Sequence, residues 1–391
     1  MTGTFVFVVC GKKEHIRTLH FSLRYLKMFS ENEIIVLTDS SRNEEPVVHT
    51  NIVDVATPKE LSHHQASIYL KVGIYKHVPK GRMYCYLDTD VIAISTDVDK
   101  VFDEFIAPIR FAKDDCKVNS FSAHAVNCDC LKDLIEPREI LQQALDPYLI
   151  RTPGQMEKRA RLNREFDRLR NDRWYKLKCD IRSTFSGRIF RLNNEFNLDK
   201  KTGIWYDSQG EEVMQSVDFD KVALQTGFTY VDSRSTWIDG SGRDLWSDDC
   251  DHLIEQIALK WNIKVEQRDW QHWNGGVFLF NDSSHKFLEA WFNKTMQIFE
   301  DPGWRTRDQG TLIATAWEHN LQHTEVLNSK WNFLADFNNP DMALNPDTGS
   351  FTDNAFQTSC KPALVHVYHH FGDTDWYLWN WIVEIPENHK T

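Results

Sequence analysis

The sequence predicts an α/β fold in which helices pack on a mostly parallel sheet. Three observations support this prediction. Strand and helix patterns alternate over the first 112 residues, two acids (Asp88 and Asp90) stand at the end of an apolar strand pattern, and the alternation resumes after about residue 266. Alternating strands and helices are typical of βαβ units. In open α/β sheets, ligands bind beyond the carboxyl ends of the strands, which is where the two acids fall.

The first part of the chain begins with the buried-strand pattern TFVFVVC over residues 4–10. Residues 15–29 follow with apolar side chains at helical spacing, and EIIVLTD over residues 33–39 predicts a second strand. A second helix is predicted over residues 62–78, where a proline and a glycine end it. The run RMYCYLD over residues 82–88 then predicts the strand that carries the acid pair.

The last part of the chain returns to the same pattern. The run WNGGVFLFN, residues 273–281, predicts a turn that feeds a buried strand. Helices are predicted over residues 285–299 and 307–320, because apolar residues recur there at helical spacing. Further strands are predicted over residues 330–337 and 361–372, and the second of these ends in a histidine cluster.

Residues 113–265 differ in composition and predict an insertion. The stretch from Arg151 to Lys178 is strongly basic and predicts a helix after Pro153, while residues 196–213 predict a small hairpin or meander. Two interpretations of the basic stretch remain open. It is either a solvated charged helix packed on the main domain or a functional basic face.

Composition excludes some classes of function. With 391 residues the chain is long enough for one large domain or two, and its hydrophobic content of 41% is typical of a globular protein. A net charge of -12 argues against a general nucleic-acid binder, which needs a positive surface. The first residues read as a strand rather than a signal peptide, and no apolar run is long enough to span a bilayer. We therefore predict a cytoplasmic protein, and the sequence leaves its oligomeric state open.

The eight cysteines are scattered, which favours reduced thiols in a cytosol. The tightest group is Cys116, Cys128 and Cys130. A C-x-C pair lacks the paired spacing of the usual zinc modules, so the sequence does not predict a zinc site there.

Asp88 and Asp90 are the first candidate site residues. In an extended chain, residues two apart point to the same face, with Cβ atoms roughly 6 to 7 Å apart. Two carboxylates among apolar and aromatic neighbours would repel each other, and a shared divalent cation would remove that cost. The alternative is a solvated acidic turn that continues into Asp97 and Asp99.

The order of the pieces resembles the GT-A glycosyltransferases, and within them the retaining family that includes glycogenin and the bacterial lipopolysaccharide galactosyltransferases (family 8). A lysine-bearing helix, YLKVGIYKHV, precedes the Asp-x-Asp (DXD) strand YLDTDVIAI, and WNGGVFLFN, RDQGTL and HHFG follow in family order. The resemblance covers residues 1–112 and 270–376. It implies a three-layer GT-A fold with residues 1–112 as the nucleotide-sugar half, residues 266–391 as the catalytic and acceptor half, and residues 113–265 as an inserted subdomain.

The resemblance also implies a metal site. Asp88 and Asp90 would hold Mn²⁺, or Mg²⁺, against the diphosphate of a nucleotide sugar, and His369 would be the third ligand. A hard cation on oxygen ligands can stabilise the charge that builds on a departing diphosphate. An imidazole among the oxygens suits manganese better than magnesium. The sequence leaves His366 open as the alternative ligand if the strand register differs.

For the remaining site residues the resemblance implies roles on the donor side. Lys71 would reach the donor, Asn274, Gly275 and Gly276 would line the sugar, and Asp308 with Gln309 would lie beneath the anomeric carbon as catalytic residues. The implied activity is that of a hexosyltransferase that uses a UDP-sugar and retains the anomeric configuration. Its acceptor would be a glycan, a lipid-linked group or a protein.

The sequence departs from the family pattern in two places. After His-x-x-Gly the family carries a Lys-Pro-Trp that binds the diphosphate, whereas this chain has DTDW. After the Asp-Gln helix start the family tends to carry an asparagine, where this chain has Ile313.

Simpler interpretations of the same residues also stay open. Lys71 could extend along a helix face toward water, the Asn274–Gly276 segment could be a turn that needs positive φ, and Asp308 could be a helix N-cap. A rival enzyme class is the haloacid-dehalogenase-type phosphatase, with Asp88 as nucleophile, Asp90 as acid/base and Mg²⁺ as cofactor. Asp248 and Asp249 would then be its later metal-binding acids. A module that docks on a polyanion through the basic stretch would explain that stretch alone.

Overall fold

The structure is a computed structural model that describes residues 3–148, 153–215, 217–335, 342–353 and 358–388. The chain divides into two compact units. The first unit comprises Met1–Cys128 and Asp249–Thr391, and the second comprises Asp129–Asp248. Among the described residues, no helix is both long and apolar enough to cross a membrane.

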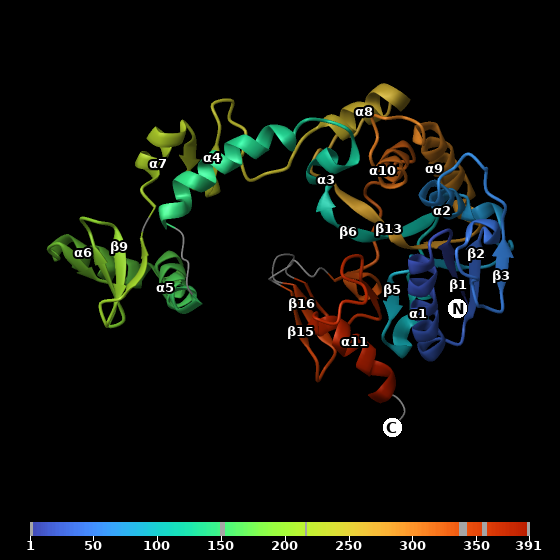
Figure 1. Cartoon of the computed structure of the whole chain (residues 1–391), viewed down its shortest axis with the longest axis horizontal. Coiled ribbons are helices and arrows are strands. Elements are labelled where there is room, and N and C mark those ends of the chain that lie inside the picture. The colour runs from blue at the N-terminus through green and yellow to red at the C-terminus, as the bar shows by residue number, and fades with distance from the viewer. Residues whose placement is uncertain (1–2, 149–152, 216, 336–341, 354–357, 389–391) are drawn as a thin grey trace. The chain divides into compact units, whose positions relative to one another are not determined.

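The first unit is built on a six-stranded sheet in the order β3-β2-β1-β4-β13-β6 (Figure 1). Strands β1, β2, β3 and β4 are parallel, and β13 is antiparallel to both β4 and β6. The strands are β1 Thr4–Val9, β2 Glu33–Thr38, β3 Ile52–Asp54, β4 Tyr84–Leu87, β6 Ile109–Lys117 and β13 Gln271–Phe280. The predicted α/β fold class is confirmed.

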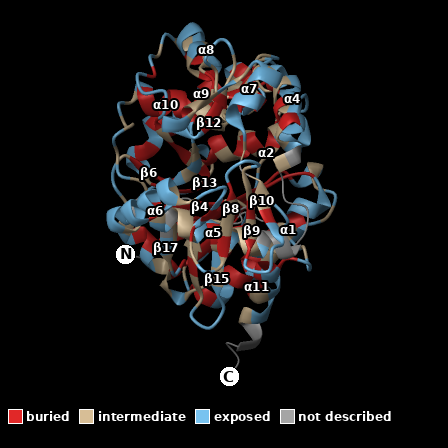
Figure 2. Cartoon of the chain, turned by 90° about the vertical axis from the view of Figure 1, so that its left-hand side faces the viewer, coloured by how far each residue is buried: buried red, intermediate tan, exposed pale blue. Residues whose placement is uncertain are grey.

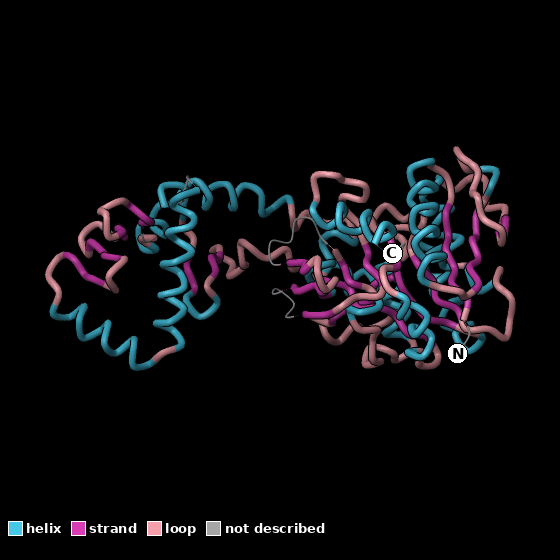
Figure 3. Tube along the Cα trace, turned by 90° about the horizontal axis from the view of Figure 1, so that it is seen from below, coloured by secondary structure: helices cyan, strands magenta, loops and turns pink. Residues whose placement is uncertain are grey.

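Helices lie on both sides of this sheet (Figure 3). Side chains alternate between two cores: Phe5 and Phe7 of β1 face one core, while Val6 and Val8 face the other. The first core contains residues of α1 and α11, and the second contains residues of α2, α8, α9 and α10. The helices of this unit are α1 Lys13–Phe29, α2 His63–Val72, α3 Val118–Ala125, α8 His252–Trp261, α9 His285–Ile298, α10 Gln309–Glu318 and α11 Tyr377–Asn388.

Two small sheets complete the first unit. One has the order β14-β18-β5, and its strands contribute to the same core as α1 and α11. The other is the antiparallel sheet β15-β16-β17. Their strands are β5 Val91–Ala93, β14 Phe333–Leu334, β18 Leu364–His366, β15 Met342–Asn345, β16 Ser350–Asp353 and β17 Thr358–Cys360. The strand predicted over residues 330–337 is shorter in the structure, and its last two residues lie outside the described part of the chain.

The second unit has its own apolar cores. Helices α5 and α6 pack with the antiparallel sheet β10-β9-β8-β7, and Leu162, Phe196 and Trp205 are buried between them. A second cluster joins α4 and α7 to the hairpin β11-β12. The elements are α4 Ile135–Leu145, α5 Pro153–Asn171, α6 Arg173–Phe185, α7 Phe219–Thr226, β7 Ile189–Arg191, β8 Phe196–Asp199, β9 Ile204–Asp207, β10 Glu212–Gln215, β11 Thr229–Val231 and β12 Thr236–Ile238.

The helix predicted after Pro153 and the predicted meander are both present as α5 and β8–β10. Several basic side chains of the unit form ion pairs with acids of the same unit. Lys158 Nζ lies 2.6 Å from Asp207 Oδ2, and Arg161 Nε lies 2.6 Å from Glu195 Oε1. These pairs neutralise part of the basic stretch, and α5 packs on α6 and the sheet of its own unit, not on the main domain as the first interpretation had it. Arg151, the first residue of that stretch, lies outside the described residues.

The second unit is shorter than the predicted insertion. Residues 113–128 and 249–265 belong to the first unit, because β6 continues to Lys117 as the edge strand of the central sheet and α3 and α8 pack beside it. The polar composition of these residues suggested an insertion, but an edge strand and two surface helices need few apolar residues. The core strands, by contrast, are among the most buried parts of the chain (Figure 2).

One acid in the first unit is expected to make stability depend on pH. Asp39 follows β2 and is 2% exposed. Its carboxylate accepts hydrogen bonds from Ser41 N and Oγ and from Thr57 N and Oγ, at 2.6 to 3.2 Å. Burial alone would raise the pKa of Asp39, but these hydrogen bonds outweigh it and lower the pKa from 3.8 to about 2. The lowered pKa contributes about 2 kcal/mol of stability above pH about 4, and this contribution is lost as the pH falls toward 2.

Asp39→Asn is therefore expected to lower the free energy of unfolding by about 2 kcal/mol near pH 6 and by clearly less near pH 3. Urea unfolding at the two pH values measures both differences. Asp97→Asn is the control, because the pKa of Asp97 is also lowered to about 2 but its side chain is 39% exposed, so a smaller effect is expected. An Asp39→Asn effect of equal size at both pH values would contradict the assignment.

Candidate active site

The acid pair lies on a turn rather than on one continuous strand. Strand β4 ends at Leu87, and β5 begins at Val91, so Asp88, Thr89 and Asp90 connect them. The backbone N–H of Asp88 donates to Gly276 O at 2.8 Å, and that of Val91 donates to Asp88 O at 3.1 Å. These bonds fix the turn at the carboxyl end of β4. The two carboxylates converge because the turn brings them together, and not through the alternation of an extended strand.

A histidine from the far end of the chain joins the acid pair. Strand β18 pairs antiparallel with β5, and the register places His366 opposite Val91. His366 Nε2 lies 3.3 Å from Asp90 Oδ1, and one ligand atom from each of Asp88, Asp90 and His366 lies within 4.8 Å of the others. The other ring nitrogen, Nδ1, lies 3.2 Å from Asn332 Oδ1 and donates its proton there. This bond keeps Nε2 directed at Asp90, so Nε2 can bind a metal that displaces its proton.

His369, the ligand that the resemblance implied, is placed differently. Its side chain is exposed, and its ring lies against Tyr368 with the ring centroids 4.4 Å apart. The next residue, His370, adopts a left-handed backbone conformation with φ of 57°. The chain has therefore left the β18 strand before His369, and His366 is the histidine that the structure brings to the acids.

Lys71 is an internal cation between two acids. It lies on α2, and its Nζ is 3.4 Å from Asp88 Oδ2 and 3.1 Å from Asp308 Oδ2. The side chain is only 12% exposed, so it does not extend toward water. Burial alone would lower the pKa of Lys71, but the two carboxylates outweigh it and raise the pKa. Lys71 is therefore a fixed positive charge beside the acid pair.

Asp308 and Gln309 stand at the start of α10. Asp308 occupies the N-cap position, but its side chain makes no capping hydrogen bond and pairs with Lys71 instead. Gln309 Nε2 donates to Asp114 Oδ2 at 3.2 Å and to Trp273 O at 2.5 Å. These bonds turn Gln309 Oε1 toward Gly275, where an added Cβ would lie 3.0 Å from it. The capping interpretation of Asp308 is therefore wrong in this structure, and Gln309 is held in a defined orientation.

The Asn274–Gly276 segment is part of β13 and not a turn. Neither glycine has positive φ. A Cβ on Gly276 would lie 2.5 Å from His366 Cε1 and 2.9 Å from Asp88 Oδ2. Space beside the acid pair, rather than backbone conformation, is what requires glycine here.

Asp114 and Asn332, which no sequence motif indicated, connect the residues of the site through hydrogen bonds. Asp114, on β6, accepts hydrogen bonds from Asn274 Nδ2 at 3.0 Å and from Gln309 Nε2. Asn332 donates to Asn274 Oδ1 at 3.2 Å and accepts from His366. A continuous network thus runs from the metal-capable group to Gln309. Asp114 follows an apolar strand pattern, as Asp88 does, and that signal could have identified it.

Beside Asp114 the structure places a second group with possible ligand atoms, made of Asp114, Cys116 and His272. His272 is fully buried, and burial lowers its pKa to about 4, so its ring is neutral. Cys116 Sγ lies 3.2 Å from His272 Nε2. Asp114 Oδ2 accepts two amide hydrogen bonds, and Oδ1 accepts from Asp115 N at 3.0 Å and from Cys116 Sγ at 3.4 Å, so both oxygens of this group are engaged within the protein.

A cavity of about 470 Å³ opens beside the acid pair. Its wall includes the carboxyl end of β1, residues of α2, and the carboxylates of Asp88, Asp90 and Asp308. Basic and imidazole side chains also line it, namely Lys12, His15, His63, His64 and Lys71. The volume is that of a typical small-ligand site. The cavity therefore combines acids that can hold a cation with donors that suit an anion.

The charges around Asp88 and Asp90 favour a bound cation. Burial raises the pKa of Asp88, and Lys71 offsets only part of that rise. At Asp90 burial acts in the same direction, but the charge and hydrogen bond of His366 outweigh it and lower the pKa. Two carboxylate oxygens and one imidazole nitrogen form a donor set that fits Mn²⁺, and less well Mg²⁺.

The acids required by the phosphatase alternative are used elsewhere. Asp248 Oδ1 accepts from Arg138 Nη2 at 2.8 Å. Asp249 accepts from Asn119 at 2.7 Å and from Ser120 at 2.8 Å. In addition, three strands precede the acid-bearing strand along the chain, whereas the phosphatase strand opens its domain. The structure therefore does not favour the phosphatase.

No family model and no curated protein matches the chain. Among solved structures, mouse xyloside xylosyltransferase 1 in its apo form is similar at 12% identity with a TM-score of 0.37, covering 93% of this chain and 97% of its own. The galactosyltransferase LgtC in complex with donor and acceptor sugar analogues is similar at 11% identity with a TM-score of 0.40, covering 98% and 95%. The bifunctional glycosyltransferase WbbM is similar at 11% identity with a TM-score of 0.38, covering 94% of this chain and 46% of its own.

Proposed function

We propose that this protein is a metal-dependent glycosyltransferase that moves a sugar from a UDP-sugar to a glycan, a lipid-linked group or a protein. One observation carries the proposal: Asp88 and Asp90, which converge with His366, lie in the wall of a cavity that Lys71 and Asp308 also line. The cavity lies at the carboxyl ends of parallel strands, where nucleotides bind in open α/β sheets.

Asp88, Asp90 and His366 would hold the metal, Mn²⁺ or Mg²⁺. When bound, a divalent cation stabilises the negative charge that develops on a departing diphosphate. The chain supplies the fixed donor geometry, because the turn at Asp88 is anchored to Gly276 and the His366 ring is oriented by Asn332. Oriented ligands of this kind raise metal affinity and limit the positions that the substrate can take.

Lys71 and the basic wall of the cavity would bind the donor. The ammonium of Lys71 is already held between Asp88 and Asp308, so it needs little further ordering to contact a phosphate or a sugar hydroxyl. Lys12, His15 and His63 offer further N–H donors along the same wall. These residues would take the place of the Lys-Pro-Trp that the chain lacks after Gly372.

We further propose that the reaction retains the anomeric configuration. Gln309 Oε1 points toward Gly275, beside Asn274 and Gly276, so it can lie beneath an anomeric carbon bound over that segment. From that face an oxygen can stabilise an oxocarbenium-like centre, while the leaving diphosphate takes the proton of the acceptor hydroxyl. An inverting enzyme needs a carboxylate base at the acceptor hydroxyl. Asp114, the carboxylate bonded to Gln309, already accepts two amide hydrogen bonds and acts as a positioning residue.

The test has two steps. A thermal-shift panel of nucleotide sugars, with and without Mn²⁺, should show stabilisation by UDP and one or more UDP-sugars only when the metal is present. Proton NMR of the early product from an α-linked donor should then show the α anomer. Gln309→Ala and Asp308→Ala should each slow transfer more than about tenfold while UDP binding changes much less.

Other outcomes are equally informative. Stabilisation by beryllium fluoride with Mg²⁺, in the absence of any response to UDP, would support the phosphatase instead. A β-anomeric early product would overturn retention but leave sugar transfer standing.

A further inference from the structure

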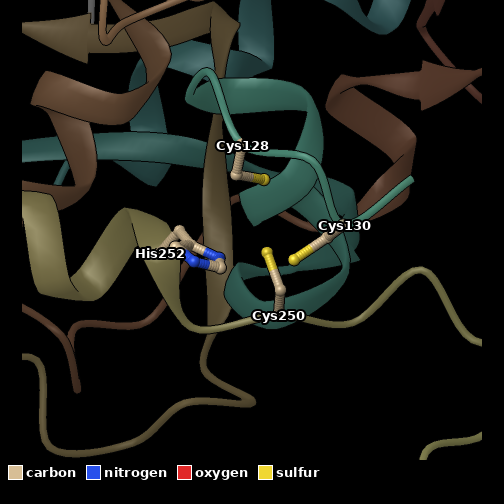
Figure 4. A group of neighbouring side chains, drawn as sticks. All are labelled: Cys128, Cys130, Cys250 and His252. Carbon is tan, nitrogen blue, oxygen red and sulfur yellow. The ribbon is translucent and has the colours of Figure 1, made fainter. Parts of the chain in front are cut away.

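Two short motifs far apart in the sequence meet outside the candidate active site. Cys128 and Cys130 follow α3, while Cys250 and His252 stand at the start of α8, about 120 residues later. One ligand atom from each of the four residues lies within 4.8 Å of the others. Figure 4 shows the three sulfur atoms and the imidazole ring turned toward a common centre. We propose that these four residues form a structural zinc site.

The donor set is that of a closed zinc site. Three thiolates and one imidazole make a Cys₃His set, which binds Zn²⁺ with tetrahedral geometry and Zn–S distances of about 2.3 Å. Tetrahedral geometry with such bonds places sulfur atoms about 3.8 Å apart. The ligand atoms, at no more than 4.8 Å, therefore need to close by about 1 Å at most, which side-chain rotation can provide.

Ligand softness separates this site from the candidate active site. Thiolates select zinc over the hard cations, whereas the carboxylates of Asp88 and Asp90 prefer Mn²⁺ or Mg²⁺. The chain would then bind two different metals at two places, one for structure and one for chemistry.

One ligand pair follows α3 along the chain, and the other is hydrogen-bonded to α3. On one side, the backbone N–H of Cys250 donates to Asn119 O at 3.1 Å, and that of Leu253 donates to Ser122 Oγ at 2.9 Å. On the other side, the segment that leads to Cys128 is held by Asn127 N, which donates to Gly303 O at 2.8 Å. The two motifs are thus positioned by protein contacts that do not depend on a metal.

The surroundings of the thiols also fit a metal-bound thiolate. Cys250 Sγ donates to Ser122 Oγ at 3.2 Å in the thiol form, and once the sulfur is deprotonated the Ser122 hydroxyl can donate to it instead. A Zn²⁺ ion with three thiolates and a neutral imidazole carries a net charge of about −1. Two guanidinium groups stand close to it: Arg243 Nη2 donates to Cys130 O at 2.7 Å, and Arg305 Nη2 donates to Cys128 O at 3.5 Å. Their charge favours the anionic complex.

The positions of the ligands suggest what the zinc would do. Cys128 and Cys250 lie at the points where the chain leaves the first unit and returns to it. A metal bound there would tie the outgoing segment to the returning one and close a loop of about 120 residues. Closing a long loop restricts the unfolded chain, so metal loss is expected to lower the thermal stability of the protein.

The test is the metal content of the full chain. Protein purified from zinc-supplemented cells and dialysed against metal-free buffer should contain about one zinc ion per chain by mass spectrometry. Cys250→Ser and His252→Ala should each lower that content roughly tenfold or more, while Cys360→Ser, which changes a half-buried cysteine outside the group, should not. Asp90→Asn should keep its zinc, which separates this site from the candidate active site.

A second measurement uses the unaltered chain, so the test does not depend on the variants folding. After zinc removal, added Co²⁺ should produce the thiolate-to-cobalt absorption bands of a tetrahedral sulfur site. Zn²⁺ added afterwards should displace the Co²⁺ and abolish these bands. Zinc content near zero together with no cobalt band would overturn the proposal. So would a native mass lighter by two hydrogens with a mapped disulfide between Cys130 and Cys250.

Discussion

Asp90→Asn is expected to lower the rate of sugar transfer about 10³-fold, because a cation that stabilises the leaving diphosphate contributes several kcal/mol to the transition state. The variant should also lose the stabilisation that UDP gives in the presence of Mn²⁺. That stabilisation is about 2.7 kcal/mol for a ligand at 100 times its Kd. Thermal shift with UDP and Mn²⁺, compared with the ligand-free melting temperature of each protein, measures it directly.

Two histidine variants sharpen this prediction. His366→Ala should behave like Asp90→Asn, since His366 Nε2 lies 3.3 Å from Asp90 Oδ1. His369→Ala should bind UDP and Mn²⁺ as the unaltered protein does, because His369 is exposed and packs on Tyr368. Asp97→Asn serves as a carboxylate control, with its partners Lys100 and Lys330 outside the cavity wall. If His369→Ala lost the response and His366→Ala kept it, the third ligand would be His369 after all.

Gly276→Ala is expected to reduce transfer about 100-fold or more and to lower the stability by about 1 to 3 kcal/mol. The new Cβ would lie 2.5 Å from His366 Cε1 and 2.9 Å from Asp88 Oδ2, and both distances are shorter than real Cβ contacts. Neither neighbour can move away easily. His366 belongs to β18, and the backbone of Asp88 is bonded to Gly276 itself. The metal ligands must therefore shift, and metal-dependent UDP binding should weaken along with transfer.

The neighbouring and distant glycines provide matched controls. Gly275→Ala should have a smaller effect, because the atoms nearest to its added Cβ, Gln309 Oε1 at 3.0 Å and Lys71 Nζ at 3.3 Å, lie farther away than those at Gly276. Gly240→Ala should be neutral, since an added Cβ there meets nothing within 4 Å and the backbone does not need glycine. Full activity of Gly276→Ala would mean that the acid pair and His366 do not act together. Measuring kcat and KM with Mn²⁺ for all three variants distinguishes these outcomes.

Local patterns in the sequence were sufficient to predict most of the framework. The alternation of apolar runs located β1, α1, β2, α2 and β4 in order. A strand buried on both faces appears as a short continuous apolar run, and a helix buried on one face has apolar residues at helical spacing, so each can be recognised in the sequence. The acid pair was visible for the same reason: two carboxylates after a buried strand have no packing role. The helix that begins at Gln309 after Asp308 was also predicted, while its place near a donor stays a prediction.

The tertiary structure decided which side chains meet. The choice between His366 and His369 depended on the register of β18 against β5, which neither strand encodes by itself. Glycine is required at position 276 because His366 and Asp88, from two other segments, lie close to its Cα. No local sequence pattern shows this closeness. Asp114 and Asn332 entered the site through hydrogen bonds to residues more than 50 positions away.

The four-residue cysteine and histidine group shows the same division most clearly. Each half, Cys128-x-Cys130 or Cys250-x-His252, is too short to indicate a metal site alone, and about 120 residues separate them. Local periodicity reports whether a residue is buried and in which kind of element, since those properties depend on near neighbours along the chain. A ligand set depends on atoms that only folding brings within a few ångströms, so the sequence determined the elements and the tertiary structure determined the sites.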